Sequence, residues 1–82
     1  MYKCRAPDGR YNLCGKHVAA FRQAREPKLS QRGLADMLQR CNVDVDKNAI
    51  QRIESGQRFV TDIELKALAQ ALGVTVEELL EP

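Results

Sequence analysis

Helix caps spaced along the chain limit its fold more than any other feature of the sequence. Ser30, Thr61 and Thr75 each stand directly before a segment whose apolar residues recur every three or four positions. A hydroxyl in that place accepts a hydrogen bond from the first helical turn, and a glutamate three residues after Thr61 and Thr75 completes a capping box. No segment shows a convincing alternation of apolar and polar residues, which a half-buried strand requires. The sequence therefore predicts an all-α fold.

Five short helices are expected between the caps and the residues that stop helices. Pro27 disfavours helix at the residue before it, while Gly56 and Gly73 suit the left-handed backbone that ends a helix. The expected helices span residues 15–25, 31–40 and 47–55, then a fourth from the Thr61 cap to the stop at Gly73, and a short fifth from the Thr75 cap to Pro82. Residues 1–14 have no helical period, so we expect a leader at 1–14 and a compact domain at 15–82. The apolar stripes expected to face the core in the last two helices are Ile63, Leu65, Leu68, Ala69 and Leu72, and then Val76, Leu79 and Leu80. Part of the last helix would also suit a dimer contact.

The two halves of the chain carry opposite net charge. Residues 1–40 hold nine Lys or Arg and three acids, a net charge of +6. Residues 41–82 hold four bases and eight acids, a net charge of −4. This division favours one face that meets an anion and another that does not, although ordinary surface charge segregates in the same way.

Several classes of protein do not fit the sequence. No apolar run approaches the roughly 20 residues of a membrane-spanning helix, and the first residues lack the apolar segment of a signal peptide. We therefore expect a cytoplasmic protein with no membrane partner. No Ser/His/Asp or Cys/His set and no Gly-rich phosphate loop has supporting context, which argues against an enzyme.

The cysteines allow a metal site in principle but do not favour one. Three cysteines cannot all pair within one chain, and a reducing compartment keeps them as free thiols. Four potential zinc ligands are Cys4, Cys14, His17 and Cys41. Nothing else in the chain resembles a zinc ribbon or finger, so we expect neither a metal nor a cofactor.

The segments 31–40 and 47–55 are typical of a helix-turn-helix. Ala35 is small where the second helix must cross the first closely, and Ile50 and Ile53 anchor the second helix in the core. The outward side of that helix is polar and long enough to reach base edges and phosphates. It carries Lys47, Asn48, Gln51 and Arg52. The same residues would also suit an ordinary solvated helix face.

Three motifs in a fixed order give the chain a resemblance to a known family. They are Ser30-Gln31-x-x-Leu34-Ala35-x-x-Leu38, Ile50-x-x-Ile53-Glu54-x-Gly56, and Ala71-Leu72-Gly73-Val74-x-Val76-x-x-Leu79-Leu80. Together they resemble the Cro/lambda-repressor (XRE) helix-turn-helix family over about residues 15–80, and the stretch from Arg58 to Leu65 resembles a bacterial or phage subgroup with a lengthened turn. The resemblance implies a compact five-helix DNA-binding domain.

The resemblance also implies a role for individual residues. Gln31 would contact a phosphate, Arg52 a phosphate or a base, and the segment from Gly56 through Gln57 and Arg58 the opposite phosphate wall. Glu54 would pair with an arginine of the first helix, for which Arg22 and Arg25 are both candidates. The residues that would face base edges in the major groove are Lys47, Asn48 and Gln51.

One stretch departs from the family pattern. The distance from Ser30 to Glu54 is longer than usual by about five residues, more than one helical turn. The additional residues lie between Leu38 and Asp46, where they either extend the helix 31–40 or enlarge the turn. Asn42 is the expected substitute for the missing turn glycine, because asparagine tolerates a left-handed backbone. Asp46 is the expected cap of the helix that follows.

Two classes of function follow. The first is a sequence-specific transcriptional regulator, a repressor that binds double-stranded DNA at an inverted repeat as a homodimer. The second is an antitoxin or other protein-interaction module on the same scaffold, which the acidic residues 62–82 and the turn Asp44-Val45-Asp46 favour. A metal- or redox-sensing regulator is a minor variant. The leader is open to three interpretations: a minor-groove arm through Lys3, Arg5 and Arg10, a dimer strap, or a lid packed by Tyr2 and Tyr11.

Overall fold

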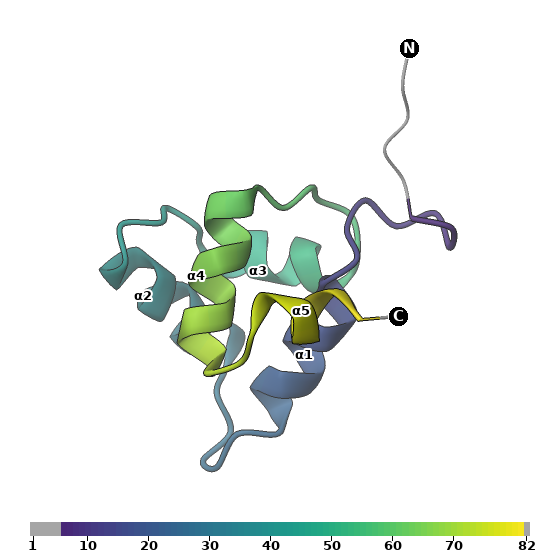
Figure 1. Ribbon diagram of the computed structural model, residues 1–82. Coiled ribbons are helices and arrows are strands. Elements are labelled where there is room, and N and C mark those ends of the chain that lie inside the picture. The colour runs from purple at the N-terminus through teal and green to yellow at the C-terminus, as the bar shows by residue number, and fades with distance from the viewer. Residues whose placement is uncertain (1–5, 82) are drawn as a thin grey trace.

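The structure, a computed structural model, describes residues 6–81, and all of its regular elements in that range are helices (Figure 1). They are α1 (Gly15–Gln23), α2 (Gln31–Arg40), α3 (Lys47–Glu54), α4 (Asp62–Leu72) and α5 (Val76–Leu80). The expected all-α fold is confirmed, and each helix lies within two residues of its expected bounds. Tyr2, Lys3, Cys4 and Arg5 lie outside the described residues.

The caps that predicted the helices form as expected. The Ser30 hydroxyl accepts a hydrogen bond from the Gly33 amide at 2.9 Å, and the Asp46 carboxylate accepts one from the Ala49 amide at 2.8 Å. Thr61 and Thr75 each form a full capping box with the glutamate three residues later. Local side-chain chemistry therefore fixes where four of the helices begin.

The core lies between the helix pair α2–α3 and a cover made of α1, α4 and α5. Helix α3 packs against α2 and α1, while α4 contacts α1, α2 and α5. In Figure 1, α4 crosses the middle of the molecule and α5 lies beside α1. The largest fully buried side chains are Leu34, Leu38, Ile50, Ile53, Leu68, Leu79, Val18, Val45 and Cys14. This aliphatic core holds α3 so that only one of its faces is buried.

Two residues expected in the core are exposed. Ile63 is 71% exposed, because five positions separate it from Leu68 and place it about 140° away around α4. Leu80 is 39% exposed, since a five-residue helix buries a single face and Leu79 occupies it. The prediction that Ile63 and Leu80 are core residues is therefore wrong.

The additional residues between α2 and α3 enlarge the turn and do not lengthen α2. Helix α2 ends at Arg40, and the amides of Asn42 and Val43 donate to the carbonyls of Gln39 and Leu38, each at 3.0 Å. This is a Schellman motif, and Asn42 takes its left-handed position with φ of 64°. Val43 and Val45 turn into the core and anchor the enlarged turn.

The left-handed backbone at Asn42 gives a test of this turn. Asn42→Gly is expected to change the free energy of unfolding by less than about 0.5 kcal/mol, because glycine adopts this backbone without a steric penalty. Asn42→Val is expected to cost about 1–2 kcal/mol, since a β-branched side chain crowds the left-handed backbone and lacks the local hydrogen bonding by which asparagine tolerates it. Urea unfolding of both variants measures the difference. Equal stabilities would contradict the left-handed assignment.

The two described cysteines differ in exposure. Cys14 is buried at the start of α1, and burial raises the pKa of its thiol to about 11, whereas Cys41 is exposed at the end of α2. Among residues 6–81, no three metal-ligating side chains lie together. Within the same range, no helix has both the length and the apolar character that crossing a bilayer requires.

Candidate nucleic-acid interface

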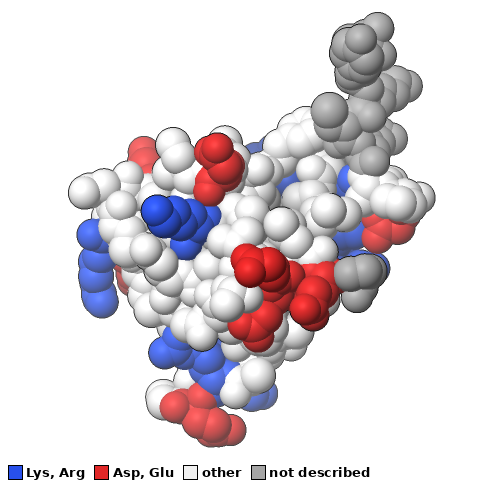
Figure 2. All heavy atoms as spheres, viewed as in Figure 1, with Lys and Arg blue, Asp and Glu red and all other residues white. Residues whose placement is uncertain are grey.

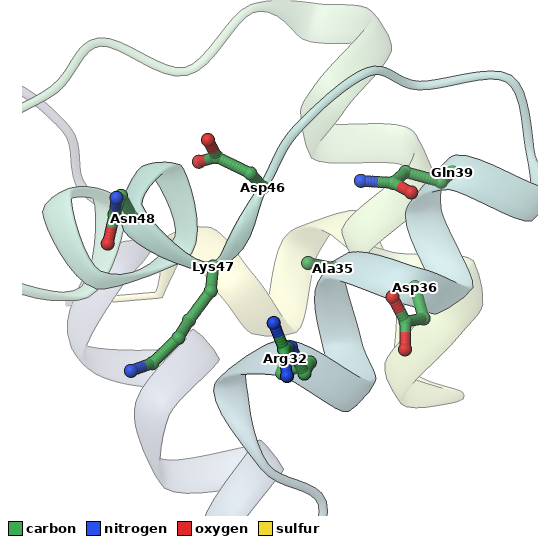
Figure 3. A pocket seen from close by; sticks show the side chains of 7 residues that line it. All are labelled: Arg32, Ala35, Asp36, Gln39, Asp46, Lys47 and Asn48. Carbon is green, nitrogen blue, oxygen red and sulfur yellow. The ribbon is translucent and has the colours of Figure 1, made fainter.

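A cleft of about 400 Å³ opens between α2 and α3. We call it the α2–α3 cleft. Figure 3 shows the side chains of its walls, with Arg32 projecting from the first turn of α2 and Lys47 from the first turn of α3. The residues that line it are Arg32, Ala35, Asp36, Gln39, Asp46, Lys47 and Asn48. Two bases, Arg32 and Lys47, thus stand at the facing starts of the two helices, two acids line the cleft beside them, and only Ala35 is apolar.

Helix α3 presents a wholly polar side to solvent. Ile50 and Ile53 are fully buried, and their spacing turns the opposite side of the eight-residue helix outward. The exposed residues of that side are Lys47, Asn48, Gln51 and Arg52. These four carry the hydrogen-bonding groups that read base edges and phosphates, so α3 has the composition of a recognition helix.

A buried ion pair ties the end of α3 to α1. The Arg22 guanidinium donates to the two carboxylate oxygens of Glu54 at 2.7 and 3.0 Å, and it also donates to the Leu29 carbonyl at 3.0 Å. The two side chains are only 13% and 8% exposed. Of the two arginines expected to pair with Glu54, the structure selects Arg22. Arg25 instead donates to the Ala71 carbonyl at 2.9 Å.

Two of the residues expected at DNA are already engaged within the protein. The Gln31 amide donates to Glu54 at 3.0 Å, so this side chain extends the Arg22–Glu54 pair to the start of α2. The Arg58 guanidinium donates to both carboxylate oxygens of Glu64 at 2.9 and 3.0 Å. Gln57, between α3 and α4, is exposed. A phosphate near Arg58 would compete with a carboxylate for the same donors.

The Arg58–Glu64 pair predicts a pH dependence of stability. Hydrogen bonds from Arg58 hold the pKa of Glu64 below its ordinary value, so the pair stabilises the folded state fully above the ordinary pKa of a glutamate. This stabilisation is lost as the pH falls through the lowered pKa. Glu64→Gln is therefore expected to cost about 1 kcal/mol at pH 7, and this cost is expected to shrink as the pH falls through the lowered pKa of Glu64. Urea unfolding across pH 2.5–7 measures this, and a cost that does not vary with pH would contradict it.

Acidic side chains gather away from the α2–α3 cleft. Figure 2 shows a group of them over α5, and they belong to Glu77, Glu78 and Glu81 at the two ends of that helix. The acids of the second half of the sequence thus form an acidic surface at α5, whereas the α2–α3 cleft is lined by two bases and two acids and carries no net charge.

The sequence of the chain matches the model of a known protein family. A family model described as helix-turn-helix matches residues 19–79, which is more than half of the chain. The chain belongs to the Cro/C1-type helix-turn-helix family. Within this family α2 and α3 are the helix-turn-helix pair, and the domain has the DNA-binding fold of transcription regulators.

Solved structures agree with this helix-turn-helix assignment. The chain is similar to the P22 c2 repressor in complex with synthetic operator 9T, with 27% identity, a TM-score of 0.69, and coverage of 85% of this chain and 96% of that one. It is similar to the restriction-modification controller protein C.AhdI from Aeromonas hydrophila, with 30% identity, a TM-score of 0.69 and coverage of 82% and 91%. It is also similar to the DNA-binding domain of BldD, with 28% identity, a TM-score of 0.65, and coverage of 87% of this chain and 93% of that one. A comparison with curated protein sequences finds no match.

Arg32 is a candidate residue of the helix-turn-helix that sequence reasoning missed. It is exposed in the first turn of α2 and lines the α2–α3 cleft with Lys47. The sequence feature that could have identified it is its position directly after the Ser30-Gln31 dipeptide, in the first turn of the helix. Its charge suits a phosphate at the rim of the cleft.

Proposed function

We propose that this helix-turn-helix protein is a sequence-specific transcriptional regulator of the cytoplasm, a repressor that binds an inverted repeat in double-stranded DNA as a homodimer. The observation that carries the proposal is the polar outer side of α3, which stands beside Arg32 while Ile50 and Ile53 fix the helix in the core. An α-helix of this kind fits the major groove of B-DNA.

Each expected DNA contact has a role in this proposal. Lys47 would bond guanine O6 or N7, and Asn48 or Gln51 would pair with adenine. Arg52 and Arg32 would neutralise phosphates on the two sides of the groove. Gln57 and Arg58 would meet the phosphate wall beyond α3, and Gln31 would meet the wall before α2.

The homodimer in this proposal is supported by an apolar surface away from the α2–α3 cleft. Leu13, Phe59 and Leu80 are 58%, 54% and 39% exposed, although each is a large apolar side chain. Tyr11, Leu13, Phe59 and Leu80 line one pocket there. Burial of such residues between two copies is favourable, and a two-fold pair would set two recognition helices about 34 Å apart.

Selection from a random pool of double-stranded DNA tests the proposal. We expect an inverted repeat to be enriched at near-physiological salt. Binding to it is expected to weaken steeply with salt, with a log–log slope near −5 for about six phosphate contacts. Enrichment of no sequence, or a slope near zero, would contradict the proposal.

A second candidate function is a protein-interaction module such as an antitoxin. It is favoured by a groove of about 520 Å³ between the leader and α5, whose wall includes Leu13 and Leu80, next to the acidic residues of α5. Purification from the native host tests this candidate. A basic protein recovered in stoichiometric amount would favour it, and a monodisperse protein without a co-purifying chain would count against it.

A further inference from the structure

We propose that residues 10–12, here called the N-terminal strap, are positioning residues of the DNA-binding unit. The inference rests on the proposed function. The strap lies upstream of the segment that matches the family, residues 19–79. It would act by holding the end of α3 and the following 55–60 loop, which carries Gln57 and Arg58, in the conformation that meets phosphate.

Asn12 is the centre of the strap. It is only 9% exposed, and its side-chain amide donates to the carbonyls of Ile53 at 3.0 Å and Arg58 at 2.8 Å. Its side-chain oxygen accepts from the Gly15 amide at 2.8 Å. One buried side chain therefore joins the start of α1, the last turn of α3 and the loop beyond α3, and every polar atom it carries is used.

Arg10 and Tyr11 hold the same stretch of backbone from the outside. The Arg10 guanidinium donates to the Glu54 carbonyl, and the Tyr11 amide donates to the Gly56 carbonyl at 2.8 Å. Arg10 packs so closely on Gly56 that a Cβ there would lie 2.7 Å from the guanidinium carbon. The rings of Tyr11 and Phe59 lie with centroids 4.9 Å apart.

The long-range hydrogen bonds of the strap go to the backbone at the end of α3 and in the loop after it. The strap holds four carbonyls, those of Ile53, Glu54, Gly56 and Arg58. None of these four hydrogen bonds goes to a side chain on the polar face of α3. Loss of the strap should therefore disturb contacts made by the 55–60 loop and spare base reading by Lys47 and Asn48.

Asn12→Asp tests the strap with almost no change in shape. The carboxylate still accepts from Gly15 but offers no donor to the carbonyls of Ile53 and Arg58. Binding to the selected operator is expected to weaken about tenfold, and the salt slope is expected to become less steep by about one or two. The selected sequence should stay the same. Asn12→Leu, which adds no charge, should have the same effect and serves as the control for charge.

Arg10→Met gives a second variant in case Asn12→Asp does not fold. Methionine keeps the apolar packing on Gly56 and removes the donor to the Glu54 carbonyl. The charge-matched control is Lys66→Met, which removes a cation from an exposed lysine of α4. We expect Arg10→Met to weaken binding by about five- to tenfold and Lys66→Met to change it by less than about threefold.

A double-mutant cycle separates positioning from a general loss of stability. If the strap acts through the 55–60 loop, Gln57→Ala should weaken binding less in the Arg10→Met background than in the wild type, whereas Lys47→Ala should weaken it equally in both. Folded strap variants with the wild-type affinity and salt slope would overturn the inference. A wild-type protein that selects no DNA would instead overturn the proposed function.

Discussion

Lys47→Ala is expected to lower affinity for the selected operator by about 10- to 100-fold and to relax base preference at one or two positions. Lys47 is the first residue of α3, is exposed, and lines the α2–α3 cleft. A lysine bonded to guanine O6 and N7 contributes about 1–3 kcal/mol of discrimination against other bases. Selection with the variant, followed by competition binding to operators with single base changes, measures both effects.

Lys66→Ala is the matched control for Lys47→Ala. Lys66 is an exposed lysine on α4 and does not line the α2–α3 cleft. Its loss removes the same charge, so only the general electrostatic attraction to DNA should fall, by less than about threefold. An equal loss in the two variants, with unchanged base preference, would show that Lys47 contributes charge alone and does not read a base.

Glu54→Ala is expected to lower the free energy of unfolding by about 3–4 kcal/mol. The substitution leaves the Arg22 guanidinium, which is 13% exposed, with the Leu29 carbonyl as its one remaining acceptor, and it also removes the partner of Gln31. Removal of one partner of a buried ion pair costs about 3–5 kcal/mol, because the other charge stays buried. For a domain of this size, the melting temperature should fall by about 12–30 °C.

Thermal and urea unfolding of Glu54→Ala, with Glu26→Ala as control, measure this effect. Glu26 is exposed in the loop after α1, and its loss should change stability by less than about 0.5 kcal/mol. Glu54→Gln keeps the size of the side chain and one acceptor, so an intermediate loss is expected. A cost below about 1 kcal/mol for Glu54→Ala would mean that the pair does not stabilise the domain.

The Arg22–Glu54–Gln31 network also connects stability with the proposed function. It joins α1, the first residue of α2 and the last residue of α3, so the relative orientation of the helix-turn-helix pair depends on it. The N-terminal strap holds the same end of α3 from the other direction. Two sets of polar contacts therefore fix an eight-residue helix that is too short to be stable alone.

The enlarged turn is where this protein differs most from the pattern that its sequence resembles. Val43 and Val45 are buried, so the additional residues are part of the core and not a mobile insertion. Asp44 and Asp46 stay exposed near the start of α3. Asp46 caps α3 through the Ala49 amide, which accounts for one acid close to the proposed DNA surface.

The sequence by itself determined the helices, their caps and the helix-turn-helix pair. These features depend on residues within about four positions of one another, so Ser30, Asp46 and Thr61 could be assigned from spacing alone. The left-handed turn residue Asn42 was predictable for the same reason. Errors arose where a local pattern does not say which face a neighbour covers, as at Ile63 and Leu80.

Only the tertiary structure decided the long-range polar contacts. Arg22 lies in the last turn of α1 and Arg25 lies just beyond its end, so the sequence left both as partners for Glu54, and the packing of α1 on α3 selected Arg22. The strap was beyond sequence reasoning because Asn12 binds backbone carbonyls more than 40 residues away. Every residue carries a carbonyl, so no side-chain pattern marks which of them a distant amide will meet. That choice is made only when the helices pack.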